Sequence, residues 1–100
     1  MIGLICKKVI FHSQLDDDMF FEWIKRIRCI SEIKGKGDEL YLYVEKDKVN
    51  EKYLREILAL FYRYNIDMKQ LQVFLNEKNK PWFFDNKEAF WNKKVFWRKD

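Results

Sequence analysis

The segment from Asn50 to Tyr64 carries the most regular hydrophobic pattern of the chain. Its large apolar residues recur with the spacing of one helix face, charged residues lie opposite, and neither Gly nor Pro interrupts them. The pattern predicts a helix that covers the core and ends at Asn65 in the left-handed conformation. The apolar stripe consists of Leu54, Ile57, Leu58 and Phe61.

Two elements are expected before this helix. β-Branched and aromatic residues from Leu4 to His12 favour a strand with apolar side chains on both faces. Asp16 is a suitable N-cap for a helix that runs to about Ile27. The buried stripe predicted for that helix is Phe20, Trp23, Ile24 and Ile27.

A β-hairpin is expected next. The segments Cys29–Lys34 and Leu40–Glu45 alternate between apolar and polar residues, and the turn residues at 35–38 separate them. Within the second strand the aliphatic side chains share one face, which we expect the helices to cover. The other face carries Tyr41 and Tyr43.

Two capping boxes follow the long helix. Asp67 with Gln70 predicts a new helix start, although the alternation over Gln70–Leu75 is also compatible with a strand. We favour the helix, because capping residues define a start whereas a short alternation is ambiguous. Beyond a break at Pro81, the second box predicts a last helix from Asp85 to about Phe96.

The element order is β-α-β-β-α followed by C-terminal helices, which predicts an α/β (α+β) fold in a single domain of residues 1–100. We expect a sheet of three or four strands with helices on one face, in the split arrangement of ferredoxin-like type. This arrangement places the first strand beside the third. A strand at Gln70–Leu75 would complete a ferredoxin-like sheet, whereas a helix there would leave the first strand as an open edge.

Composition is that of a folded protein, with 48% apolar and 36% charged residues. The N-terminus lacks a basic start, and Lys7 and Lys8 interrupt its apolar run, so we expect a cytoplasmic protein without a membrane span. Cys6 and Cys29 are expected to be buried free thiols. A bridge between them would be possible if two strands paired, but a chain without an export signal rarely uses one.

Residues suited to catalysis are scarce. His12 precedes three aspartates, but a histidine at a strand end followed by helix-capping acids needs no catalytic role. Neither serine has the setting of a catalytic triad, and Gly35-Lys36-Gly37 is too short for a phosphate-binding loop. We therefore expect no enzyme, no metal site, no cofactor and no small-molecule substrate.

The C-terminal segment, residues 80–100, is an aromatic and basic extension that we expect to dock on the domain. Residues 51–100 hold eleven Lys or Arg against seven Asp or Glu, whereas residues 1–50 hold nine of each. No single helix stripe can bury every ring of the extension, so part of its aromatic surface should be exposed. The residues predicted to bind a partner are Trp82, Phe84, Trp91, Lys93, Lys94, Trp97 and Arg98.

Two of these residues should differ in exposure. Trp91 and Trp97 are about 240° apart around a helix, so one is expected to face the domain and the other to face away. Trp91 aligns with Val95, and Trp97 aligns with Phe90. Tyr41 and Tyr43 on the hairpin form an alternative binding surface, because strand aromatics can stack on bases.

These features favour a noncatalytic protein–protein interaction module of the toxin-immunity, antitoxin or adaptor type. Its partner would be a toxin or a second copy of the chain. The alternative is a nucleic-acid (RNA) binding protein that uses the basic aromatic C-terminal half. A net charge of +4 with sixteen acidic residues is modest for such a groove.

Overall fold

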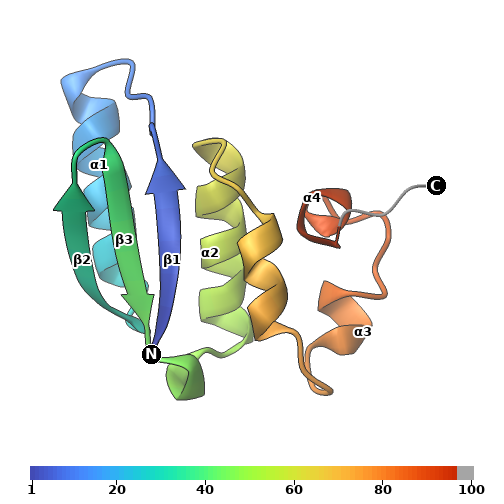
Figure 1. The fold of residues 1–100 in the computed structure, drawn as a ribbon. Coiled ribbons are helices and arrows are strands. Elements are labelled where there is room, and N and C mark those ends of the chain that lie inside the picture. The colour runs from blue at the N-terminus through green and yellow to red at the C-terminus, as the bar shows by residue number, and fades with distance from the viewer. Residues whose placement is uncertain (97–100) are drawn as a thin grey trace.

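A three-stranded antiparallel sheet with helices packed against it forms the fold in the computed structural model, which describes residues 1–96 (Figure 1). The expected α+β class is confirmed. Four short 3-10 or α-helical segments accompany the main elements within the described residues; 3-10 helices are labelled η. In chain order the elements are β1 (Ile2–Lys7), α1 (Gln14–Arg26), β2 (Ile30–Lys36), β3 (Glu39–Val44), η1 (Lys46–Lys48), α2 (Glu51–Arg63), η2 (Lys69–Phe74), α3 (Lys80–Phe83) and α4 (Asn92–Phe96).

The strand order is β1-β3-β2, and β3 pairs antiparallel with both neighbours. The first strand therefore lies beside the third, as expected. Leu42 of β3 stands opposite Leu4 of β1 and Ile33 of β2. Residues 69–74, where a strand or a helix was expected, form the 3-10 helix η2, so they do not add a fourth strand.

The hydrophobic core lies between the sheet and the helices α1 and α2. The whole predicted stripe of α2 is buried, and each of its four side chains contributes roughly 1.5–3 kcal/mol by leaving water. In α1, Phe20, Ile24 and Ile27 are buried, while Trp23 is half-buried and donates its Nε1–H to Glu56 of α2 over 2.9 Å. The sheet supplies Leu4, Cys6, Leu42 and Val44.

Side-chain caps fix the starts of both long helices. The N-cap of α1 is Ser13 and not the expected Asp16, because the Ser13 Oγ accepts a hydrogen bond from the Asp16 N–H at 3.1 Å. The Asp16 carboxylate instead accepts from the backbone N–H of His12 at 3.0 Å. In α2 the N-cap is Asn50, and the expected left-handed Asn65 is confirmed by its φ of 55°.

The first strand is shorter than expected. It ends at Lys7, because Lys8 turns the chain with a φ of 49° and donates its N–H to the Asp38 carbonyl at 3.1 Å. The expected strand as far as His12 was therefore wrong. In the hairpin, two residues join β2 to β3, and Gly37 supplies the positive φ of 61° that this tight turn requires.

The last expected helix was also misplaced. It begins at Asn92 and not at Asp85, because the Asp85 carboxylate pairs with Lys80 at 3.2 Å instead of capping a helix. Residues 85–91 form turns, and the short helix α3 before them was not expected. Within residues 1–96, every helix is too short or too polar to cross a lipid bilayer.

Candidate functional site

The C-terminal segment packs against the outer side of α2 through its tryptophans. Trp91 is only 5% exposed, and its Nε1–H donates to the Phe83 carbonyl at 2.9 Å. Trp82 is half-buried, with its ring centroid 5.8 Å from that of Trp91 in an edge-to-face arrangement. The Arg55 guanidinium of α2 lies 4.3 Å from the Trp82 ring and 5.7 Å from the Trp91 ring, so it ties both rings to α2.

The seven predicted partner-binding residues thus lie in different environments. Trp91 is part of the core together with Val95, which leaves its ring little surface for a partner. Phe84 is half-buried, and its ring centroid is 4.9 Å from that of Phe96. Lys93 and Lys94 are exposed. Trp97 and Arg98 lie outside the described residues.

An exposed aromatic pair stands beside this packed cluster. Tyr62 of α2 is 49% exposed and Phe90, before α4, is 47% exposed, and their ring centroids are 4.8 Å apart. They border a shallow hollow of about 590 Å³, which we call the aromatic hollow. Its lining residues are Trp23, Ala59, Tyr62, Arg63 and Phe90.

Basic side chains surround the aromatic hollow. Arg63 lines it directly, and the Lys94 Nζ lies 5.7 Å from the centre of the Tyr62 ring. A second hollow of about 330 Å³, also lined by Tyr62, includes Lys69, Lys93 and Lys94, with Asp67 as its acidic residue. Positive charge therefore predominates on both sides of the exposed tyrosine.

Sequence reasoning placed neither Tyr62 nor Phe90 among the binding residues. One feature of the sequence indicated that Tyr62 is exposed: it lies to the side of the apolar stripe of α2 that packs into the core. The meeting of Tyr62 with Phe90 had no local signal, since it depends on how the turns after Asp85 bring the chain back to α2. Within residues 80–96, the exposed aromatic ring is that of Phe90, next to the buried Trp91.

The alternative surface is the open face of the sheet, where Tyr41 and Tyr43 are half-buried. Their rings are each approached by a lysine of β2 at 5.9 Å. The Tyr41 hydroxyl donates to the Glu39 carboxylate at 2.9 Å, which raises the pKa of Tyr41. Because Glu39 also pairs with Lys7 at 3.8 Å, the charges of this face largely compensate each other, which disfavours phosphate binding.

Two of the residues considered for catalysis make contacts that stabilise the fold, because Ser13 caps α1 and Asp16 accepts hydrogen bonds. The pKa of Asp16 is lowered by hydrogen bonds from the His12 backbone and from the Tyr64 hydroxyl, which lies 2.9 Å from Asp16 Oδ1. Cys6 and Cys29 are free and buried, and desolvation raises their pKa values to about 12 and about 11. Among residues 1–96, no three His, Cys, Asp or Glu side chains gather as metal ligands would.

Comparison of the chain with protein-family models, curated proteins and solved structures found no match. The candidate site is accordingly defined by its geometry. Of the described surface, the aromatic hollow combines features that a binding site needs: two large exposed rings, a concave shape and an arginine in its lining.

Proposed function

We propose that this protein is a noncatalytic module that acts by binding another protein, in the manner of toxin-immunity proteins, antitoxins or adaptors. The observation that carries the proposal is the aromatic hollow, where Tyr62 and Phe90 stay about half exposed although the adjacent Trp91 is buried. Aromatic residues and arginine are the types most enriched among binding hot spots. The free thiols Cys6 and Cys29 suit a reducing compartment such as the cytoplasm.

The chemistry of the hollow indicates what kind of partner it fits. Its apolar wall accepts an aliphatic or aromatic side chain, and the cations of Arg63 and Lys94 at its rim attract carboxylates. The net charge of +4 also accelerates association with an acidic protein. The partner is therefore an acidic protein that presents an exposed apolar side chain, and a toxin with such a surface belongs to this class.

The test compares variants of the hollow against the purified partner. The partner is isolated with the tagged protein from its own cells, identified by mass spectrometry, and titrated in a calorimeter. Phe90→Ala should raise Kd about 30-fold, which corresponds to a hot spot of about 2 kcal/mol. Arg63→Glu should raise Kd at least about tenfold, and this loss should shrink at high salt.

A matched control separates binding from stability. Val73→Ala truncates a side chain of η2 that is 41% exposed and does not line the hollow, so Kd and Tm should stay at the wild-type values. Phe90→Ala should also keep Tm within a few degrees, since its ring is already half exposed. If Phe90→Ala and Arg63→Glu both bind the partner as tightly as the wild type does, the aromatic hollow is not the binding site.

Nucleic-acid binding is the second candidate function, and the hollow lined by Lys69, Lys93 and Lys94 beside Tyr62 favours it. Such lysines would neutralise phosphates while the tyrosine ring stacks on a base. Binding of a labelled single-stranded RNA should then weaken steeply with salt. The variant with Lys93→Ala and Lys94→Ala should lower the slope of log K against log salt by about two. Absence of RNA and DNA binding at low salt would exclude this candidate.

A further inference from the structure

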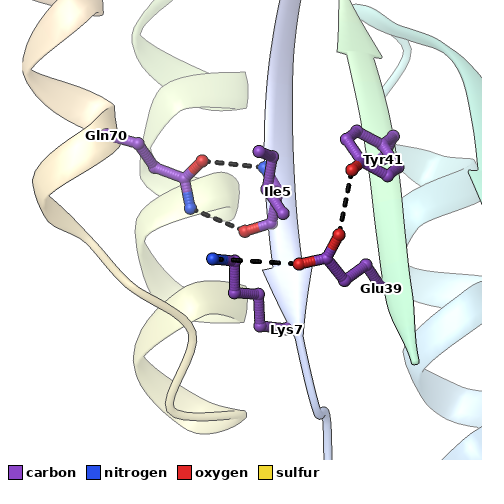
Figure 2. A network of polar contacts seen from close by, with 5 residues as sticks. All are labelled: Ile5, Lys7, Glu39, Tyr41 and Gln70. Atoms are coloured by element: carbon purple, nitrogen blue, oxygen red, sulfur yellow. Dashed lines mark hydrogen bonds and ion pairs between the residues drawn. The ribbon is translucent and has the colours of Figure 1, made fainter. Parts of the chain in front are cut away.

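The two edges of the sheet differ in how they are protected. At the β1 edge, the Gln70 side chain of η2 accepts a hydrogen bond from the Ile5 N–H and donates one to the Ile5 carbonyl, each over 2.8 Å (Figure 2). This amide occupies the place that a neighbouring strand would take. At the opposite edge, β2 is the outermost strand, and Figure 1 shows no segment beyond it. Residues 31–36 are all exposed.

The pairing pattern determines which backbone groups of β2 face outward. Ile5 directs its N–H and C=O toward Gln70, so it does not exchange hydrogen bonds with Tyr41, its partner in β3. In an antiparallel sheet these directions alternate, so Tyr41 bonds to Lys34 on its other side. Ile33 and Gly35, one residue to either side of Lys34, therefore point their N–H and C=O groups away from the sheet.

We infer that the β2 edge binds a second copy of this chain. The two β2 strands pair antiparallel about a two-fold axis at Ile33, which joins two three-stranded sheets into one of six strands. Ile33 then exchanges both backbone hydrogen bonds with Ile33 of the second copy. The regular pairing is short, because β2 shifts its register against β3 between Ile30 and Glu32. The Ile33 side chain, 37% exposed in the single chain, becomes covered by its counterpart.

The charges of β2 are complementary in this register. Glu32 and Lys34 project from the same face of the strand and form an exposed pair at 3.5 Å within one chain. With Ile33 on the axis, each Glu32 stands opposite Lys34 of the second copy, so the strand is self-complementary. A shift by two residues in one direction places Lys34 opposite Lys34, with each Glu32 opposite Lys36, and a shift in the other direction places Glu32 opposite Glu32.

Charged residues on an edge strand commonly discourage pairing with other chains. Charged residues discourage such pairing when like charges face each other across the two strands. In the register centred on Ile33, the opposite charges at positions 32 and 34 face each other and attract. Each shifted register thus brings two like charges together at the axis, whereas the register centred on Ile33 brings none together. The same arrangement makes the inference testable by reversing charges singly and together.

The experiment measures the dimer dissociation constant of the full chain by sedimentation velocity over a range of concentrations. Lys34→Glu and Glu32→Lys should each raise this constant at least about tenfold, because both cross-strand pairs become repulsive. The double variant Glu32→Lys with Lys34→Glu is again self-complementary and should dimerise like the wild type. An equimolar mixture of the two single variants should form a heterodimer, since their reversed charges then face each other.

Two further variants control for net charge and register. Lys52→Glu on α2 changes the net charge by the same amount as Lys34→Glu and should leave dimerisation unchanged. Ile33→Cys, oxidised with diamide, should give a disulfide-linked dimer, because opposed Cα atoms in a hydrogen-bonded pair lie about 5.5 Å apart. Lys46→Cys, in η1 outside the sheet, should give no disulfide-linked dimer under the same treatment.

The inference is wrong if the wild-type chain sediments as a monomer at high micromolar concentration. It is also wrong if the mixture of single variants does not associate, or if Phe90→Ala abolishes the dimer while Lys34→Glu preserves it. The last result would assign self-association to the aromatic hollow. Conversely, if Phe90→Ala loses partner binding but keeps the dimer, both proposals are supported. The aromatic hollow then binds the partner and the β2 edge forms the dimer, independently of each other.

Discussion

Replacing Gln70 with methionine removes the hydrogen bonds that hold the β1 edge while keeping the length and apolar stem of the side chain. The two bonds to Ile5 are each worth about 0.5–1.5 kcal/mol net, so the variant should lose about 2 kcal/mol of unfolding free energy. For a domain of this size the loss corresponds to a fall in Tm of about 8–16 °C. Circular dichroism measures Tm, and NMR measures the exchange rate of the Ile5 amide.

Gln72→Met is the matched control for this change. Gln72 also lies in η2, and it donates a single hydrogen bond to the Val95 carbonyl at 2.8 Å. Its loss should lower the stability by about half as much and leave the Ile5 amide protected. If Gln70→Met melts like the wild type and its Ile5 amide still exchanges slowly, packing of the helices holds the edge and the hydrogen bonds do not.

A companion variant, Gln70→Glu, tests the donor role of the side-chain amide. Its carboxylate can still accept from the Ile5 N–H, but it faces the carbonyl oxygens of Ile5 and Asp67, to which the amide nitrogen donates at 2.8 Å in the wild type. At neutral pH this variant should therefore be less stable than Gln70→Met. As the pH falls below about 4, protonation supplies a donor and the difference should narrow. A stability gap that does not change with pH would contradict this assignment.

Three further predictions concern stability and reactivity. Trp91→Ala should cost about 3–5 kcal/mol, measured by urea denaturation, because it empties a buried site. The backbone and side-chain hydrogen bonds that Asp16 accepts lower its pKa from 3.8. The stability they contribute is therefore present above that pH and is lost as the pH falls below it. In Asp16→Asn, Tm measured at acidic pH should therefore decrease less steeply with falling pH than in the wild type. Cys6 and Cys29 should react with a thiol reagent only as fast as the chain unfolds.

Local patterns sufficed to predict the elements whose stability depends on nearby residues. The stripe of α2 repeats over two turns, and Asn65 supplies a left-handed stop at its end, so two independent signals agree. The hairpin was predictable for the same reason, because Gly37 provides the turn between two alternating strands. The position of β1 beside β3 followed from the handedness of the connection through α1.

Sequence reasoning failed where an ion pair or tertiary packing overrides the local helix signals. Asp85 has the spacing of a helix cap, but the ion pair with Lys80 draws its carboxylate away from the backbone N–H groups that follow. Of the neighbours Phe90 and Trp91, only packing against Arg55 and Trp82 decides that the tryptophan is buried. The aromatic hollow could not be predicted, because its rings come from distant parts of the chain.

The closure of the β1 edge by Gln70 also has a consequence for biosynthesis. Gln70 follows Ile5 by 65 residues, so at about 5–20 residues per second the ribosome adds it roughly 3–13 s later. During that interval the nascent chain has β1 but lacks the side chain that covers its outer edge. A β-strand edge exposed on a translating ribosome can pair with other chains or bind chaperones. Substitutions at Gln70 should therefore reduce the yield of folded protein during expression by more than the loss of equilibrium stability alone would predict.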